Sequence, residues 1–334
     1  MVDGKVLATR FAGAADFETR KVISGGNELE IFFLDGLTSS GDIADFIVRP
    51  LHEARQDERE ETLFTRAERG LVWCASMKKA SSTDEAAELL VNGFCVILFP
   101  KSGKALGCEV KTGEKRSPSA PEAENTVKGA KDAFTETLRT NTSLIRRHLR
   151  TPELRLEESV VGRRSLTKVT VCWVEGLTDP ELPARMKKRL GEIDIDGLLS
   201  PAAVEEYVTG ARKTAFPLLE FTERTDHFCQ GLLDGQVGLL VDGLPIGYLA
   251  PVSFGRLMRS PEDRATDYLS ASMLRILRYL ALGVSLLLPG IYAAMAMFHQ
   301  QMLPTKLLLS IIESKQDVPF STLFEVVGLL CAFE

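Results

Sequence analysis

The chain has 334 residues, of which 45% are hydrophobic and 26% are charged, and its formal net charge is −6. This composition excludes a wholly disordered or collagen-like chain. The acidic balance also argues against a phosphate-binding surface over the whole protein, so no nucleic-acid partner is expected. All of the net charge lies in residues 1–270, because residues 271–334 hold four basic and four acidic residues. The first part is expected to be a soluble acidic region and the second a membrane region.

The six cysteines form no C-x-x-C pair, and the four histidines form no H-x-x-x-H motif. A zinc site or a disulfide framework is therefore not expected, and a reducing compartment is the default. The chain also lacks the P-loop, the dinucleotide-binding glycine motif, the G-x-S-x-G elbow and H-E-x-x-H. We therefore expect no catalytic residues, no cofactor and no metal.

Residues 1–252 contain two similar halves, and such a repeat predicts two copies of one structural unit. The segment 29–51 resembles 169–191, and its Asp-Gly-Leu-Thr run at 35–38 matches the Glu-Gly-Leu-Thr run at 175–178 at an offset of 140. We call this four-residue run, which has Asp or Glu at its first position followed by Gly-Leu-Thr, the DEGLT motif. In each half it predicts a strand that ends in the motif and a helix that begins just after it, capped by the Thr or by a following Ser or Asp.

Further along each half, a second helix is expected to run into a turn, at Asn92-Gly93 in the first half and Asp234-Gly235 in the second. A hairpin then follows in each half. Its two strands are expected at 94–99 and 105–110 in the first half, and at 236–241 and 245–250 in the second. The predicted fold class is α/β, with two tandem similar α/β subdomains, each a small mixed sheet with helices packed on it.

The predicted domains are a first subdomain at 1–110, a polar linker at 111–131, a second subdomain at 132–255 and a membrane region at 256–334. The linker is assigned because it is rich in Pro, Ser and charge.

The membrane region contains twenty consecutive residues without a charge, 279–298. A helix of this length spans roughly 30 Å, the hydrocarbon thickness of a bilayer. A buried core helix is the alternative, but core helices are rarely apolar on every face over such a length. Four arginines lie in the twenty residues before the span and two lysines in the twenty after it. The positive-inside rule then places the large N-terminal region in the cytoplasm.

Two more apolar segments follow the span. Residues 303–315 have helical spacing but are too short and too charged to span, so an interfacial or re-entrant helix is expected. Residues 323–334 are the beginning of a second apolar run at the end of the chain. We therefore expect a C-terminally truncated chain.

Several long phrases, in residues 128–150, 216–245 and 273–311, resemble the GerA family of spore germination proteins. More narrowly, they resemble the A subunit of germinant receptors or its paralogue encoded with the spoVA genes. The resemblance covers 128–322 strongly and 29–51 moderately. Two departures are present, since the family's Gly-Pro-x-Glu-Gly run is altered at 129–133 and its TERPD phrase has Thr225 in place of Pro.

Two of these phrases supply the candidate contact residues. The phrase at 132–150 reads as one amphipathic helix with a solvated arginine face. The alternatives are an inter-subunit contact, because guanidinium forks suit carboxylates, and then an anionic-ligand site. The run at 140–142 interrupts good helix formers, so a kink or a bound polar partner is expected.

The phrase at 222–228 reads as a Thr cap at Thr222, followed by the first helical turn with an arginine ion pair. A catalytic acid–base set would need a nucleophile or a metal, and none is found. Together the two phrases give these candidate interface or ligand contacts: Arg139, Thr140, Asn141, Thr142, Arg146, Arg147, Glu223, Arg224 and Asp226.

The resemblance implies a non-enzymatic membrane subunit of a spore germination receptor that takes part in nutrient sensing and ion release. It implies B and C subunits as partners, a homo-oligomer, contact with membrane lipid, and a small nutrient bound through the complex. It also implies a location in the inner membrane of the spore, with the N-terminal domain on the cytoplasmic side. The residues alone also allow a membrane-tethered ligand-binding or scaffold module without channel activity, whose two lobes close on a small solute.

Overall fold

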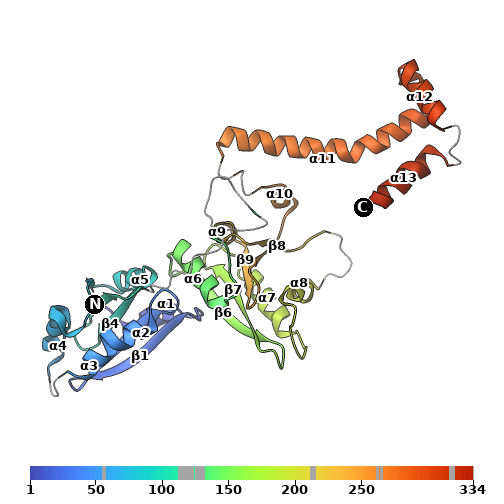
Figure 1. The fold of residues 1–334 in the computed structure, drawn as a ribbon. Coiled ribbons are helices and arrows are strands. Elements are labelled where there is room, and N and C mark those ends of the chain that lie inside the picture. The colour runs from blue at the N-terminus through green and yellow to red at the C-terminus, as the bar shows by residue number, and fades with distance from the viewer. Residues whose placement is uncertain are drawn as a thin grey trace. The chain divides into compact units, whose positions relative to one another are not determined.

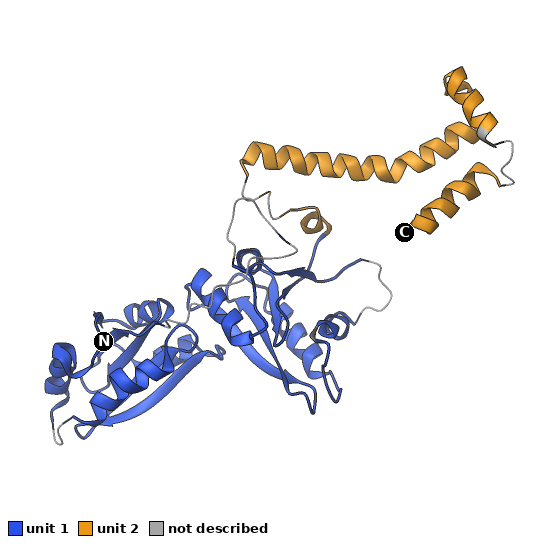
Figure 2. Cartoon of the chain, in the orientation of Figure 1, with its two compact units in different colours: residues 1–253 blue, residues 254–334 orange. Residues whose placement is uncertain are grey.

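The computed structural model describes residues 1–54, 58–111, 124, 132–210, 216–260, 263, 266–315 and 320–333. Contacts divide the chain into two compact units, residues 1–253 and 254–334 (Figure 2). The first unit contains two sheets with helices packed on them, and the second is helical (Figure 1). The predicted linker lies outside the described residues except for Lys111 and Glu124.

The first half of unit 1 contains one five-stranded sheet and the helices around it. Its elements are α1 (Gly4–Arg10), β1 (Phe17–Ser24), β2 (Asn27–Leu34), α2 (Ser40–Asp42), the π-helix η1 (Ile43–Val48), α3 (Arg49–His52), α4 (Glu60–Arg66), the π-helix η2 (Ala67–Leu71), β3 (Met77–Ala80), α5 (Thr83–Val91), β4 (Phe94–Phe99) and β5 (Lys104–Glu109).

The second half repeats this plan with fewer helices between its strands. Its elements are α6 (Leu138–His148), β6 (Leu154–Val161), β7 (Thr167–Val174), α7 (Glu181–Gly191), the 3-10 helix η3 (Pro201–Ala203), α8 (Val204–Thr209), β8 (Glu220–Thr222), α9 (Thr225–Leu233), β9 (Val237–Val241) and β10 (Gly247–Ala250).

The two sheets have the same topology. Their strand orders are β1-β2-β4-β5-β3 and β6-β7-β9-β10-β8. The predicted duplication is therefore confirmed, as are the two predicted hairpins, β4–β5 and β9–β10. The prediction of mixed sheets is wrong, because every pair of described neighbouring strands is antiparallel. Hairpins join four of these pairs, and a hairpin forces its two strands to be antiparallel.

The DEGLT motif lies at the predicted strand exit in both halves. Gly36 and Gly176 follow β2 and β7 with φ of 88° and 83°, in the left-handed region that glycine adopts without strain. In the first half the Ser39 hydroxyl accepts the amide N–H of Asp42 at 3.3 Å and caps α2. In the second half the Asp179 carboxylate accepts an amide N–H at the start of α7, at 3.0 Å. The predicted cap is thus confirmed in the first half, whereas the N-cap of α7 is Pro180, which makes no side-chain capping bond.

Each sheet is covered by helices on both faces, and each face has its own hydrophobic core. In the first half one core lies under η1, α3 and α4 and the other under α1 and α5. In the second half α6 and α9 cover one face, and α7 and α8 cover the other. The central strands β4 and β9 are buried along their whole length, which explains why their sequences are continuous apolar runs.

Unit 2 consists of α10 (Phe254–Leu257), α11 (Tyr268–Met297), η5 (Gln300–Met302), α12 (Thr305–Lys315) and α13 (Thr322–Phe333). Within the described residues, α11 alone is long and apolar enough to cross a membrane. It has 30 residues and begins eleven residues before the predicted span at 279–298. Arg278 inside this extension forms a bidentate ion pair with Asp263, at 2.6 and 2.7 Å, which ties the preceding segment to the helix.

Candidate ligand cleft

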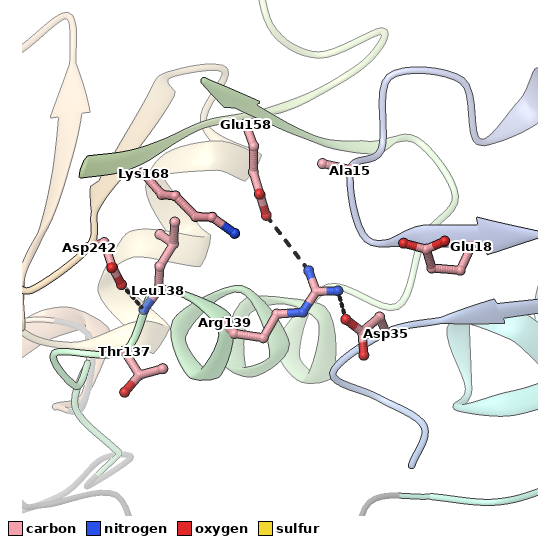
Figure 3. Close-up of a pocket in the computed structure, with 9 residues that line it drawn as sticks. All are labelled: Ala15, Glu18, Asp35, Thr137, Leu138, Arg139, Glu158, Lys168 and Asp242. Atoms are coloured by element: carbon pink, nitrogen blue, oxygen red, sulfur yellow. Dashed lines mark hydrogen bonds and ion pairs between the residues drawn. The ribbon is translucent and has the colours of Figure 1, made fainter. Parts of the chain in front are cut away.

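A cleft of about 480 Å³ lies between the two halves of unit 1 (Figure 3). It is lined by residues of both: Ala15, Glu18 and Asp35 from the first half, and Thr137, Leu138, Arg139, Glu158, Lys168 and Asp242 from the second. Its side chains thus carry both signs of charge. We refer to it as the cleft.

Arg139 in the first turn of α6 is the centre of this arrangement. Its guanidinium forms an ion pair with Asp35 of the DEGLT motif, and its Nη1 lies 3.7 Å from Oε1 of Glu158 (Figure 3). The side chain keeps 34% of its surface exposed, so a ligand can reach it. Gly36 allows α6 to come this close, since a Cβ there would lie 3.1 Å from Cβ of Ser143. The motif therefore positions the carboxylate of Asp35, and its glycine leaves room for α6, which carries Arg139.

The second half holds the first turn of α6 in place. The backbone N–H of Leu138 donates to Oδ1 of Asp242, at 3.0 Å, in the β9–β10 turn (Figure 3). Asn141 is fully buried and brackets Thr135, accepting its N–H at 2.7 Å and donating to its carbonyl at 2.6 Å. The predicted kink is absent, because α6 runs unbroken over Leu138–His148. The polar partner predicted for this run is the backbone just before the helix.

A buried ion pair joins the two halves beside the cleft. Arg146 of α6 donates from Nε and Nη2 to the two carboxylate oxygens of Asp16, at 2.7 and 2.9 Å. Both side chains are at most 3% exposed. The backbone N–H of Ala15 also donates to the carbonyl of Leu156 at 2.8 Å. The predicted fully solvated arginine face is therefore wrong at Arg146, whose guanidinium is enclosed within the chain.

The remaining candidates lie away from the cleft lining. Thr142 is buried, and its hydroxyl donates to the carbonyl of Arg139 at 3.0 Å. Thr140 is half-buried, and its carbonyl accepts the hydroxyl of Ser143 at 2.8 Å. Arg147 is exposed near the end of α6.

The second candidate phrase forms the start of α9. Arg224 is buried and donates from Nε and Nη2 to Asp226, at 3.0 and 2.6 Å, as the predicted ion pair requires. The predicted cap at Thr222 is wrong, because Thr222 pairs with Gly247 in the sheet and α9 begins only at Thr225. The carbonyl of Glu223 accepts the N–H of Phe134 at 2.8 Å. This phrase thus fastens α9 to the sheet.

His227, in the first half of α9, lies between two carboxylates. Its Nε2 is 3.1 Å from Oε1 of Glu220, and its Nδ1 is 3.9 Å from Oε1 of Glu124. Burial disfavours the charged imidazolium, but the neighbouring carboxylates of Glu124 and Glu220 outweigh burial and raise the pKa of His227. Glu124, although burial opposes its charge, has a lowered pKa through His227 and Thr222.

The raised pKa of His227 predicts that the free energy of unfolding of the chain depends on pH. Because folding raises its pKa, the stabilisation is full below the unfolded value of about 6.5 and disappears as pH rises through the folded value. The unfolding free energy of the chain should therefore fall relative to that of His227→Gln as pH rises above about 6.5. Urea unfolding at several pH values measures this difference. Parallel curves for the two proteins would contradict the assignment.

Comparison with known proteins identifies the family of this chain. Residues 5–334 match the model of the Bacillus/Clostridium GerA spore germination protein. The chain belongs to the GerA family. It is 31% identical to spore germination protein KA of Bacillus subtilis (strain 168) over 92% of this chain and 56% of that protein. It is 32% identical to the membrane protein YfkQ of the same organism, over 91% and 59%.

A solved GerA-family structure shares the fold. The N-terminal domain of the A subunit of the Bacillus megaterium spore germinant receptor GerK3 superposes with a TM-score of 0.57 at 25% identity, over 75% of this chain and 93% of that domain. The GerA proteins are non-enzymatic receptor proteins. The present chain spans between half and two thirds of the length of KA and YfkQ.

Of the nine predicted contact residues, Arg139 lines the cleft and the other eight do not. Sequence reasoning missed the other charged residues that line the cleft with Arg139, among them three carboxylates and a lysine: Asp35, Glu158, Asp242 and Lys168. Asp35 could have been found, because it belongs to the repeated motif. Asp242 stands in a recognisable Asp-Gly turn. Glu158 and Lys168 lie on β6 and β7 in positions that no local pattern distinguishes from ordinary exposed strand residues.

Proposed function

We propose that this GerA-family chain is a membrane subunit of a spore germination receptor that takes part in nutrient sensing and ion release. The observation that carries the proposal is the cleft, which both halves build around Arg139 and which contains charges of both signs. Its volume lies in the range of small-molecule pockets. Membership of the GerA family, with a germinant-receptor A subunit as a structural relative, supports the same role.

The charges of the cleft suit a small zwitterion such as a free amino acid. A ligand carboxylate would meet Arg139 and Lys168, and no ion pair joins Lys168 to another described residue. A ligand ammonium would meet Glu158 or Asp242, the latter of which also accepts the N–H of Leu138. A bound carboxylate competes with Asp35 for Arg139. Ligand binding would therefore loosen one contact between the halves.

In this proposal α11 (Tyr268–Met297) crosses the inner membrane of the spore in contact with lipid, and unit 1 lies on the cytoplasmic side. The arginines that precede the uncharged stretch of the helix support that side. The proposed partners are the B and C subunits of the receptor and further copies of the same chain. Homology to a receptor A subunit supports an assembly of this kind.

A ligand-binding or scaffold module without channel activity is the second candidate. One observation favours it: α11, the described helix that is long enough to span, has no ionisable group between Tyr279 and Met297 other than the two tyrosines. Charged or carbonyl-lined constrictions are the usual devices of ion selectivity. A module of this kind would leave ion flux unchanged when its gene is deleted.

Ligand titration tests the cleft. The full chain in detergent is titrated calorimetrically with each of the common L-amino acids, and at least one should bind saturably. Arg139→Gln should weaken that binding at least about tenfold, since hydrogen bonds to charged groups contribute about 1.5–3 kcal/mol. The control is Arg185→Gln, which removes an exposed arginine of α7. Absence of saturable binding, or equal binding by both variants, would refute an amino-acid site at Arg139.

A further inference from the structure

The face of α6 that meets the first half of unit 1 carries a stripe of arginines. Arg139, Arg146 and Arg147 lie on α6 (Leu138–His148), and Arg150 follows two residues after the helix ends. The two arginines nearer the start of the helix are neutralised by Asp35 and Asp16. Arg147 and Arg150 are exposed, and neither forms an ion pair with a described residue.

These two arginines line a second pocket, of about 340 Å³, which shares no residue with the cleft. Its lining is Leu37, Val91, Asn92, Gly93, Lys111, Arg147 and Arg150. It therefore holds three cations and no carboxylate. Lys111 is already paired with Glu109, at 2.6 Å, and Glu109 lies outside the lining. Among the described residues, about two positive charges of this pocket remain without a counter-charge, in a protein whose net charge is −6.

The first half shapes this pocket through the turn before β4. Gly93 has φ of 80°, and a Cβ there would lie 3.3 Å from Cγ of Lys111 and 3.6 Å from the carbonyl of Leu37. The glycine thus lets the lysine stem pass close to the DEGLT motif. The ammonium group then lies 5.3 Å from the centre of the Phe94 ring. The repeat supplies a contrast, because the corresponding turn of the second half has Asp234 where Asn92 stands. The first-half turn lacks the acid that would neutralise such a pocket.

We propose that this basic pocket binds a small oxyanion carrying two negative charges, such as phosphate or a short dicarboxylate. Guanidinium groups match carboxylate and phosphate oxygens in geometry, and Arg147 and Arg150 line this pocket together with Lys111 and Asn92. The charge of the anion equals the charge left uncompensated. Its ligands come from both halves of unit 1, so the bound anion ties the end of α6 to the Asn-Gly turn. This site is independent of the proposed amino-acid site in the cleft.

The test is a titration of the full chain in detergent at constant ionic strength with inorganic phosphate, malonate and acetate. We expect saturable binding of at least one dianion, at least about tenfold tighter than that of acetate, because a second charge adds a second charge-assisted contact. The double variant Arg147→Gln/Arg150→Gln should lose at least about tenfold in affinity. The matched control, Arg163→Gln/Arg164→Gln, removes the same charge from two exposed arginines in the turn between β6 and β7.

Stronger binding of phosphate than of malonate assigns the pocket to phosphoryl groups, and the reverse order assigns it to dicarboxylates. Circular dichroism checks that both double variants are folded. Equal losses in the two double variants would overturn the proposal, as would effects of all three anions that are weak and do not saturate. Arg139→Gln should leave dianion binding unchanged, which separates this site from the cleft.

Discussion

Arg146→Met is expected to lower the free energy of unfolding by about 3–5 kcal/mol, the usual cost of removing one partner from a buried ion pair. The methionine fills most of the space, but it leaves the carboxylate of Asp16 buried without a counter-charge. The carbonyl of Thr151 also loses its bond from Nη1, at 3.2 Å. Urea unfolding of the full chain, followed by tryptophan fluorescence, measures the change.

Two further variants separate the effect of the lost charge on stability from the effect of the lost packing. Arg146→Met/Asp16→Leu should regain most of the lost stability, because an apolar pair of similar volume removes the isolated charge. Arg163→Met, at an arginine whose side chain is 70% exposed, should change stability by less than about 0.5 kcal/mol. A loss below about 1 kcal/mol in Arg146→Met would show that the pair does not hold the halves together.

Phe228→Ala is expected to cost about 3–5 kcal/mol through the cavity that it leaves. The ring is fully buried in the core under α9 and meets Phe134 edge-on, with ring centres 5.3 Å apart. Two glycines make room for it. A Cβ on Gly238 would lie 2.2 Å from the ring, and one on Gly247 would lie 2.6 Å from it. The backbone of the sheet thus forms one wall of the pocket that the ring fills.

The same unfolding measurement shows whether the loss of stability comes from the packing of the Phe228 ring or would follow any large-to-small substitution in α9 and its sheet. Phe228→Leu keeps most of the volume and should cost less than half as much as the alanine variant. Phe221→Ala, at a ring that is 61% exposed on β8, should cost less than about 1 kcal/mol. If the two alanine variants were equally destabilised, the wall formed by the glycines would not be the cause.

The duplication explains why so much of the fold could be predicted. Both copies carry the DEGLT motif and an Asn-Gly or Asp-Gly turn, and these local signals locate strand exits and hairpins. The direction of pairing between β2 and β4 could not be predicted in the same way, because these strands are separated by more than fifty residues and no short-range pattern sets their order.

The site was harder to predict because its partners are distant in the sequence. Helical periodicity locates Arg146 on α6, but its buried state depends on Asp16, 130 residues earlier. Arg139 depends likewise on Asp35, 104 residues earlier. Charged residues next to an apolar stripe usually face water, so a pattern alone favours exposure. Only the fold decides which arginine meets a carboxylate and which does not.

Ion release from spores shows whether amino-acid binding at Arg139 controls germination. In the organism that encodes this chain, the gene is deleted and then restored as the natural sequence, as Arg139→Gln or as Arg185→Gln, and ion release is recorded against the concentration of the amino acid that binds. We expect the natural sequence and Arg185→Gln to restore release. Arg139→Gln should need about tenfold more amino acid for the same rate, because it binds the amino acid more weakly. Release that is unchanged by deletion, or an identical dose response for Arg139→Gln, would contradict the proposed function.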